Sequence, residues 1–247
     1  VSVVLFSQLI GAVFLILLAM IFSGSFPPLR DMLLGGLAGV FGVLGLMALY
    51  EGLSRGRMGI VAPLSAIVTA LIPIGFAFFN EGLPRSSQIL GLGLALFSVW
   101  LLSYTKSEEK KHRFTEFILP LLSGFGFGLF FILIDTAIQV SVLWPLVGTR
   151  CMSLLMMSIL FISSSSARVP QKAQLSFIAL AGICDVLGNM FFALATNMGR
   201  LDISAMLSSL FPAATVTLAW LFLKEKLNRH QWCGVVVALA ALFLISA

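Results

Sequence analysis

Long apolar runs dominate this chain and follow one another with only short polar breaks. Each run holds about 20 residues, which is the length that a helix needs to cross the hydrocarbon core of a bilayer. Strands of a membrane barrel would be about 10 residues long with alternating polarity, so helices fit the runs better. The sequence therefore predicts nine transmembrane helices, near residues 3–22, 32–53, 59–80, 87–105, 117–138, 143–163, 175–197, 203–223 and 231–247.

The scarcity of charge excludes a soluble domain. Only 10% of the 247 residues are charged, whereas a soluble domain carries about 25%. The net charge of +5 comes from Lys and Arg residues that lie between the apolar runs, a pattern typical of membrane orientation rather than of nucleic-acid binding. Cys151, Cys184 and Cys233 lie inside apolar runs and form no CxxC pair, so we interpret them as small buried apolar residues. We predict no metal site and no cofactor.

The Lys and Arg residues between the runs predict the orientation of the chain. Eleven of them fall on one side of the membrane and three fall on the other, namely Arg30, Arg85 and Arg200. Cytoplasmic loops carry the excess of Lys and Arg in membrane proteins. The segment Lys106–Arg113 contributes four of the eleven and is therefore expected in the cytoplasm.

The chain also contains an internal duplication. A shift of 143 residues aligns 56–103 with 199–246 without a gap, and 14 of the 48 positions are identical. The identical pairs include residues that apolar composition alone would not bring into register: Gly56 and Gly199, Arg57 and Arg200, Ser65 and Ser208, Gln88 and Gln231, and Gly91 and Gly234. The Lys and Arg count places Arg57 and Arg200 on opposite sides, so we expect inverted copies, an arrangement typical of secondary transporters.

This duplication divides the chain into a first repeat over 1–105, a linker over 106–116 and a second repeat over 117–247. The first repeat contains four of the predicted helices and the second contains five. A further helix of about 20 residues is therefore expected before Val1. The chain does not begin with Met, which agrees with this expectation.

Two stretches resemble the paired repeats of EamA-type transporters in the drug/metabolite transporter superfamily. One runs from Tyr50 to Pro63 and the other from Ser208 to Leu227. In that family an acidic turn precedes the last helix of each repeat, and the corresponding turns here are Asn80-Glu81-Gly82-Leu83 and Lys224-Glu225-Lys226-Leu227. The resemblance covers essentially the whole chain.

The resemblance implies an all-α bundle of ten helices in two inverted five-helix halves around a central cavity, of which this chain lacks the first helix. It also implies export of a small metabolite, amino acid or drug across the prokaryotic cytoplasmic membrane by secondary transport. Because the missing helix would line the cavity, a membrane scaffold or assembly partner that does not transport is the alternative. The oligomeric state stays open, with a homodimer as one option.

Polar residues near the middle of the predicted spans are the candidates for substrate binding or coupling. Asp185 lies near the middle of the span 175–197, and Asn189 and Thr196 follow on the same helical face. Arg150 lies within about two turns of the centre of the preceding span. In one interpretation Asp185 binds a proton or cation, while Arg150 acts as a counter-charge or binds a substrate carboxylate. In the other, an Asp185–Arg150 ion pair only holds helices together.

Residues nearer the membrane boundaries are weaker candidates. Tyr50 and Glu51 close the span 32–53 at its predicted cytoplasmic end, and Asp135 closes another span at the outer end. Each is either an interfacial residue or a substrate contact. Trp220 lies deeper in its span, where it would either stack on an aromatic or cationic substrate or face lipid.

Glycines and prolines predict packing and helix breaks. Two GxxxG pairs, Gly35 with Gly39 and Gly124 with Gly128, predict close helix contacts. Three prolines are predicted to interrupt helices, namely Pro63, Pro73 and Pro212.

The sequence contains no enzyme motif and no ATP-binding segment. We therefore predict that the protein is not an enzyme and that transport would be driven by a gradient, with proton or cation coupling as one option.

Overall fold

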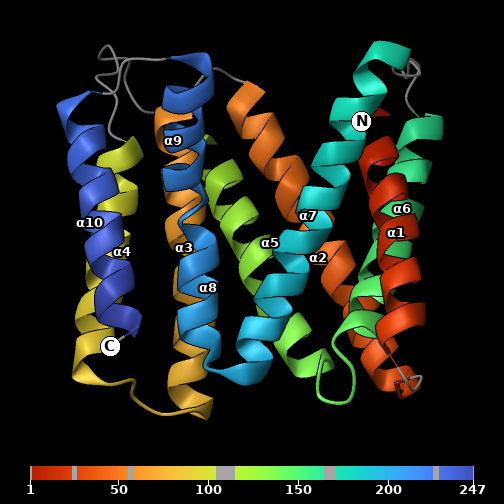
Figure 1. The fold of residues 1–247 in the computed structure, drawn as a ribbon, viewed down its shortest axis with the longest axis horizontal. Helices are drawn as coiled ribbons and strands as arrows, with labels where there is room; N and C mark the ends of the chain where they lie inside the picture. Colours follow the sequence, from red (N-terminus) through yellow and green to blue (C-terminus); the bar gives the residue numbers. More distant parts are fainter. Residues whose placement is uncertain are drawn as a thin grey trace. The chain divides into compact units, whose positions relative to one another are not determined.

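The computed structural model describes residues 2–23, 27–54, 58–103, 115–163, 171–224 and 228–246, and every regular element in those ranges is an α-helix (Figure 1). The helices are α1 (Ser2–Phe22), α2 (Leu29–Ser54), α3 (Met58–Asn80), α4 (Ser86–Ser103), α5 (Thr115–Ala137), α6 (Leu143–Ser163), α7 (Lys172–Met198), α8 (Leu201–Ser209), α9 (Phe211–Leu223) and α10 (Arg229–Ser246).

The length and the apolar composition of the helices confirm the coarse fold class. Six of the described helices are long and apolar enough to cross a membrane, and shorter apolar stretches cover Ser86–Leu102, Leu201–Ala214 and Arg229–Leu244. The expected all-helical, polytopic membrane protein is therefore confirmed. The count of nine spans stays a prediction.

The predicted span 203–223 is not one continuous helix, because α8 ends and α9 begins within it. The N–H of Leu210 donates to the carbonyl of Leu207 at 3.2 Å, and the N–H of Ala213 donates to the carbonyl of Leu210 at 2.9 Å. Both bonds join residues three apart, as in a 3₁₀ turn, whereas an α-helix joins residues four apart. Pro212 has no N–H and cannot continue that pattern, so the interruption predicted at this proline is confirmed.

The interruptions predicted at Pro63 and Pro73 are wrong, since both residues lie inside the single helix α3. A proline removes one backbone hydrogen bond but need not end a helix inside a bundle, where neighbouring groups can satisfy the freed carbonyl. Pro120 is likewise inside α5.

The chain divides into two compact units. Unit 1 contains Val1–Val43 and Leu129–Met198, and unit 2 contains Leu44–Gly128 and Gly199–Ala247. Each unit takes helices from both predicted repeats, and α2 and α5 contribute to both units. The compact units and the sequence repeats are therefore different divisions of the chain, and the repeat boundaries stay a prediction.

Small residues bring α2 and α6 into close contact within unit 1. A Cβ atom on Gly35 would lie 2.1 Å from the carbonyl oxygen of Pro145, and one on Gly39 would lie 2.4 Å from that of Thr149. The Thr149 hydroxyl donates to the carbonyl of Gly35 at 2.8 Å. The close contact predicted from this GxxxG pair is confirmed.

The second GxxxG pair packs α5 against α3 in unit 2. A Cβ atom on Gly124 would lie 2.5 Å from Cβ of Val68, and one on Gly128 would lie 2.8 Å from Cβ of Ile72. Close contact is confirmed here too. An apolar core of unit 2 joins residues of α3, α4, α8 and α10 and the residue that follows α8: Ala66, Ala70, Leu92, Ala95, Val99, Met206, Leu210 and Ala241.

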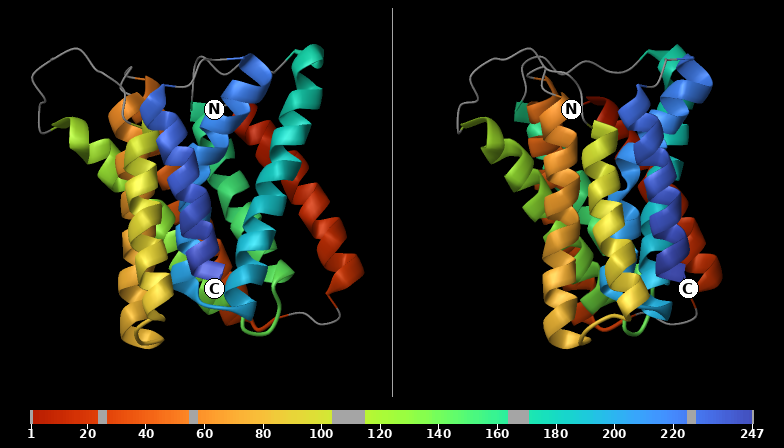
Figure 2. Two further views of the ribbon diagram at one scale, coloured as in Figure 1. Left: turned by 60° about the vertical axis from the view of Figure 1, so that its left-hand side comes forward. Right: turned by 90° about the vertical axis from the view of Figure 1, so that its left-hand side faces the viewer.

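Helices α4 and α10 pack side by side and antiparallel in unit 2 (Figures 1 and 2). The Ser98 hydroxyl donates to the carbonyl of Gly234 at 2.8 Å. A Cβ atom on Gly234 would lie 2.7 Å from Cγ of Leu102. Since Leu102 is near the end of α4 and Gly234 is near the start of α10, these contacts fix the opposite directions of the two helices.

The same cap begins α4 and α10. The backbone N–H of Arg85 donates to Oε1 of Gln88 at 3.0 Å, and that of Asn228 donates to Oε1 of Gln231 at 2.9 Å. A Gln at the third helical position that accepts from the N-cap backbone is half of a capping box. The identical glutamines of the 143-residue alignment therefore have the same structural role.

Candidate functional site

Arg150 lies in α6 and is almost fully buried, with 4% of its surface exposed. A charged side chain at membrane depth costs at least about 2.5–3.5 kcal/mol, so such residues are paired or face a polar cavity. Its buried neighbours Thr149 and Ser153 donate instead to the carbonyls of Gly35 and Gly39 on α2. The partners of Arg150 lie on other helices.

Two partners from α1 and α7 meet the same nitrogen of Arg150. Nη1 lies 2.6 Å from Oδ2 of Asp185 on α7, and it also donates to Oε1 of Gln8 on α1. The Arg150–Asp185 ion pair that the sequence offered as one interpretation is present. We name Arg150, Asp185 and Gln8 the Arg150 cluster, and all three belong to unit 1.

The two charges of the pair differ sharply in exposure. The Arg150 side chain is 5% exposed, whereas that of Asp185 is 52% exposed. The carboxylate is therefore open on one side, while the guanidinium is enclosed.

Arg150 is also incompletely satisfied. Its Nη2 is buried and has no hydrogen-bond partner among the described residues. A buried donor without a partner costs about 1–3 kcal/mol, and more when it is charged. Such an atom in a native structure requires an explanation.

Only one of the two residues predicted to share the face of Asp185 reaches it. Asn189 donates to Oδ1 of Asp185 at 3.5 Å, the limit for a hydrogen bond. Thr196 donates instead to Oδ1 of Asp135 on α5 at 2.5 Å. About three turns of α7 separate Thr196 from Asp185, so Thr196 forms a second polar contact rather than part of the Arg150 cluster.

The sequence-based reasoning did not include Gln8. It lies in the first apolar run, where the amide is one of few polar side chains, next to Ser7. A polar residue inside a predicted span is the signal that would have identified it. Its partner could not be inferred, because 142 residues separate it from Arg150.

The other predicted site residues belong to unit 2. Trp220 packs edge-to-face against Trp232, with ring centroids 5.2 Å apart, and is 42% exposed. Tyr50 and Glu51 near the end of α2 are also exposed. The structure does not gather these three residues into one described cluster.

The cysteines were predicted to be buried, and that prediction is wrong. All three are exposed on helix surfaces. A membrane helix can present a small apolar side chain to lipid as readily as to the protein interior, because the lipid chains are themselves apolar.

A second polar cluster lies in unit 2, around Arg200. Its Nε and Nη2 bind the two carboxylate oxygens of Asp202 at 3.1 and 3.0 Å, and Nη2 also donates to the carbonyl of Gly82 at 2.7 Å. The hydrogen bond to Asp202 raises the pKa of Arg200 above its already high value, so the guanidinium stays charged. This cluster ties the turn after α3 to the start of α8 and has a structural role.

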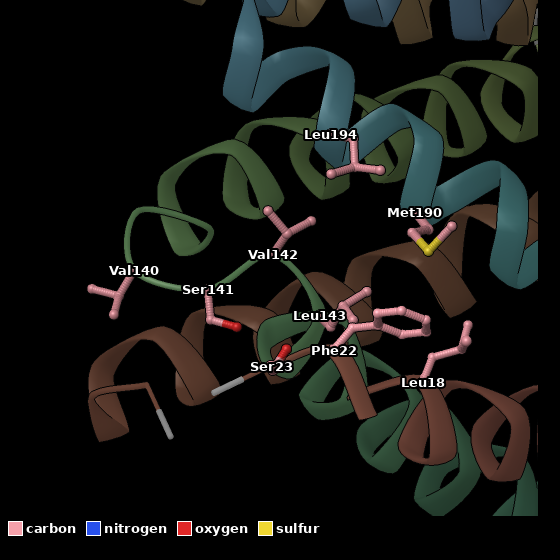
Figure 3. Close-up of a pocket in the computed structure, with 9 residues that line it drawn as sticks. All are labelled: Leu18, Phe22, Ser23, Val140, Ser141, Val142, Leu143, Met190 and Leu194. Carbon is pink, nitrogen blue, oxygen red and sulfur yellow. The ribbon is translucent and has the colours of Figure 1, made fainter. Parts of the chain in front are cut away.

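Unit 1 also contains an apolar groove of about 540 Å³ at the end of α1, shown in Figure 3. Its walls come from the end of α1, the α5–α6 connection and α7: Leu18, Phe22, Ser23, Val140, Ser141, Val142, Leu143, Met190 and Leu194. The volume is in the range of small-molecule sites, about 300–1,000 Å³. None of these nine described residues is charged, so they would hold an apolar group without specifying one.

Comparison with known proteins gives a family, a related sequence and similar folds. Residues 115–247, more than half of the chain, match the EamA-like transporter family. An uncharacterized protein of Methanocaldococcus jannaschii is 28% identical over 134 residues, which cover 53% of this chain and 96% of that protein. A protein of known crystal structure is similar with a TM-score of 0.82 and 14% identity, over 99% of this chain and 88% of that one. The structural match concerns the fold alone.

Proposed function

Because the chain belongs to the EamA-like transporter family, we propose that it is a secondary active transporter that exports a small metabolite, amino acid or drug across the prokaryotic cytoplasmic membrane. The family is one of transporters rather than of enzymes. The single observation that carries the proposal is the Arg150 cluster, in which a buried guanidinium faces a half-exposed carboxylate among apolar helices.

Helix boundaries support two inverted repeats as the basis of alternating access. A shift of 143 residues carries the bounds of α3 (58–80) onto the combined bounds of α8 and α9 (201–223). The same shift carries α4 (86–103) onto α10 (229–246). The equivalent helices α4 and α10 are antiparallel, as inversion requires. In addition, the matched relative from Methanocaldococcus jannaschii is little longer than the 134 aligned residues, about the size of one repeat.

The broken helix supports the same mechanism. Transporters of many folds use discontinuous helices whose ends expose backbone groups near the centre of the membrane. Here the carbonyl of Ser208 would be the α-helical acceptor for residue 212, and Pro212 has no N–H to donate. The break between α8 and α9 is in unit 2, and we propose that it moves during transport.

Asp185 is the proposed proton-binding residue. Arg150 from α6 faces its carboxylate, and Gln8 from α1 accepts a hydrogen bond from the same nitrogen of Arg150. Helix α1 contains no charged or titratable residue; α6 contains Arg150 and Cys151, and α7 contains Lys172 and Cys184 besides Asp185. Binding of a proton to Asp185 would release Arg150 from its partner, and loss of the proton would restore the pair. This exchange would couple a proton gradient to the state of the cluster.

The orientation that we propose follows the Lys and Arg count, with the segment Lys106–Arg113 in the cytoplasm. Export would then proceed toward the side that carries Arg30, Arg85 and Arg200.

The variant Asp185→Asn tests this function. We expect it to fold and to lose the stimulation of export by a pH gradient, because asparagine cannot bind and release a proton. The measurement is the efflux of a radiolabelled amino-acid mixture from vesicles containing the purified protein, with and without an inward proton gradient.

The neighbouring variant Cys184→Ala serves as the control, since Cys184 is an exposed residue on the same turn and should leave efflux unchanged. Gradient-stimulated efflux equal to wild type in Asp185→Asn would contradict the proton role. Efflux indistinguishable from protein-free vesicles in every protein would instead favour the scaffold alternative for these solutes.

A further inference from the structure

The guanidinium of Arg150 has one terminal nitrogen that is shared and one that is unused. Nη1 contacts both Asp185 and Gln8, while Nη2 is buried and without a partner among the described residues. The preferred geometry between Arg and a carboxylate is a fork in which two nitrogens each donate to one oxygen. Asp185 therefore uses only part of the binding capacity of Arg150.

From this geometry we infer that Arg150 is the binding site for the carboxylate group of a small monoanionic solute, which takes the place of Asp185. The incoming carboxylate would accept from Nη1, and from Nη2 as the second arm of the fork. Asp185 is the open side of the cluster, because its side chain is 52% exposed and that of Arg150 is only 5% exposed. A ligand would therefore approach along the face that Asp185 now occupies.

Charge selects the class of ligand. Arg150 is the basic residue of the cluster. Helix α1 has no charged residue, and the other basic residue of these three helices, Lys172, is the first residue of α7, thirteen residues before Asp185. One guanidinium neutralises one negative charge. A phosphate monoester carries about 1.5 to 2 negative charges at neutral pH and would leave excess charge in an apolar setting, so a monocarboxylate fits better.

Asp185 then acts as an internal competitor for Arg150. While it is ionised, it holds Nη1 and repels a second carboxylate. The inference deepens the proposed transport function and rests on it for its biological meaning. Binding can nevertheless be measured without transport, so the two can fail separately.

The test is the binding of defined probes to the purified full chain in detergent, followed by thermal unfolding. The probes are hexanoate, its neutral analogue hexanamide, N-acetylalanine and inorganic phosphate. In the variant Asp185→Asn we expect the half-saturating concentration of hexanoate to fall about tenfold, since a like charge at a binding site is strongly unfavourable. In Arg150→Gln we expect no saturable effect of hexanoate, and in every protein none of hexanamide or phosphate.

The variant Arg150→Lys covers the case in which Arg150→Gln does not fold. It keeps the charge but loses the fork, so we expect hexanoate to bind with a half-saturating concentration about tenfold above wild type. Stronger binding of N-acetylalanine than hexanoate would indicate a water-soluble metabolite, and the reverse a fatty acid; either supports the carboxylate site.

Unchanged or weaker hexanoate binding in Asp185→Asn would overturn the inference, as would equal binding of hexanamide. Failure of gradient-stimulated export in the wild-type protein would not affect this result, because no transport enters the measurement.

Discussion

Replacing Arg200 by methionine is expected to lower the free energy of unfolding by about 3–5 kcal/mol, the range for breaking a buried ion pair from one side. Asp202 is 2% exposed, and each of its carboxylate oxygens accepts a hydrogen bond from Arg200, with a further one to Oδ1 from the backbone N–H of Ile203. Without the guanidinium, that carboxylate stays buried next to the carbonyl of Gly82, which loses its donor as well. Thermal unfolding of the purified protein in detergent measures the loss.

Two variants make this result specific. Arg200→Met combined with Asp202→Asn should recover much of the stability, because the uncompensated charge is gone. Arg85→Met removes an exposed arginine from the connection between α3 and α4 and should change stability by less than about 0.5 kcal/mol. If Arg200→Met is no less stable than Arg85→Met, the cluster does not hold α3 to α8.

The second large effect is expected for Gly35→Ala, which should destabilise the protein by about 1–3 kcal/mol or more. The added Cβ would lie 2.1 Å from the carbonyl oxygen and 2.7 Å from the carbonyl carbon of Pro145. Both atoms belong to the backbone of α6, so a side-chain rotation cannot relieve the contact. Helices α2 and α6 would have to separate, and the hydrogen bond from Thr149 to Gly35 would be lengthened.

Gly188→Ala is the matched control in the same unit. An added Cβ there meets no atom within 4 Å, so only helix propensity acts, and alanine is favoured over glycine by about 1 kcal/mol. The two substitutions are chemically identical and should therefore shift the unfolding temperature in opposite directions. Equal shifts would contradict the close packing of α2 on α6.

Helix existence was predictable in this protein because burial in lipid leaves few options. An apolar run must pair its backbone groups internally, and a helix does so locally. Gln88 and Gln231 cap helices through contacts with residues three positions earlier. Because this role is local, it is preserved in both copies of the duplication, and the sequence alignment shows the two glutamines in register. Proline positions were less informative. Pro73 lies within an intact helix, whereas Pro212 follows a break.

The candidate site was predictable only in part. Asp185 and Arg150 stood out because charge is costly at depth, and one interpretation paired them. Gln8 and the incomplete use of Arg150 could not be derived, because they depend on how α1, α6 and α7 pack. Thr196 shares a helical face with Asp185 by periodicity, yet a carboxylate from α5 lies closer to it.

The sequence by itself determined that this chain is an all-helical membrane protein, where its apolar helices lie, and that 56–103 and 199–246 are related. All of these are local or repetitive properties that hydrophobicity and spacing express directly. Only the tertiary structure decided which polar groups meet, which nitrogen of Arg150 lacks a partner, and which of the three prolines accompanies a helix break. Those features arise from contacts between residues far apart in the chain, and single-residue chemistry does not specify them.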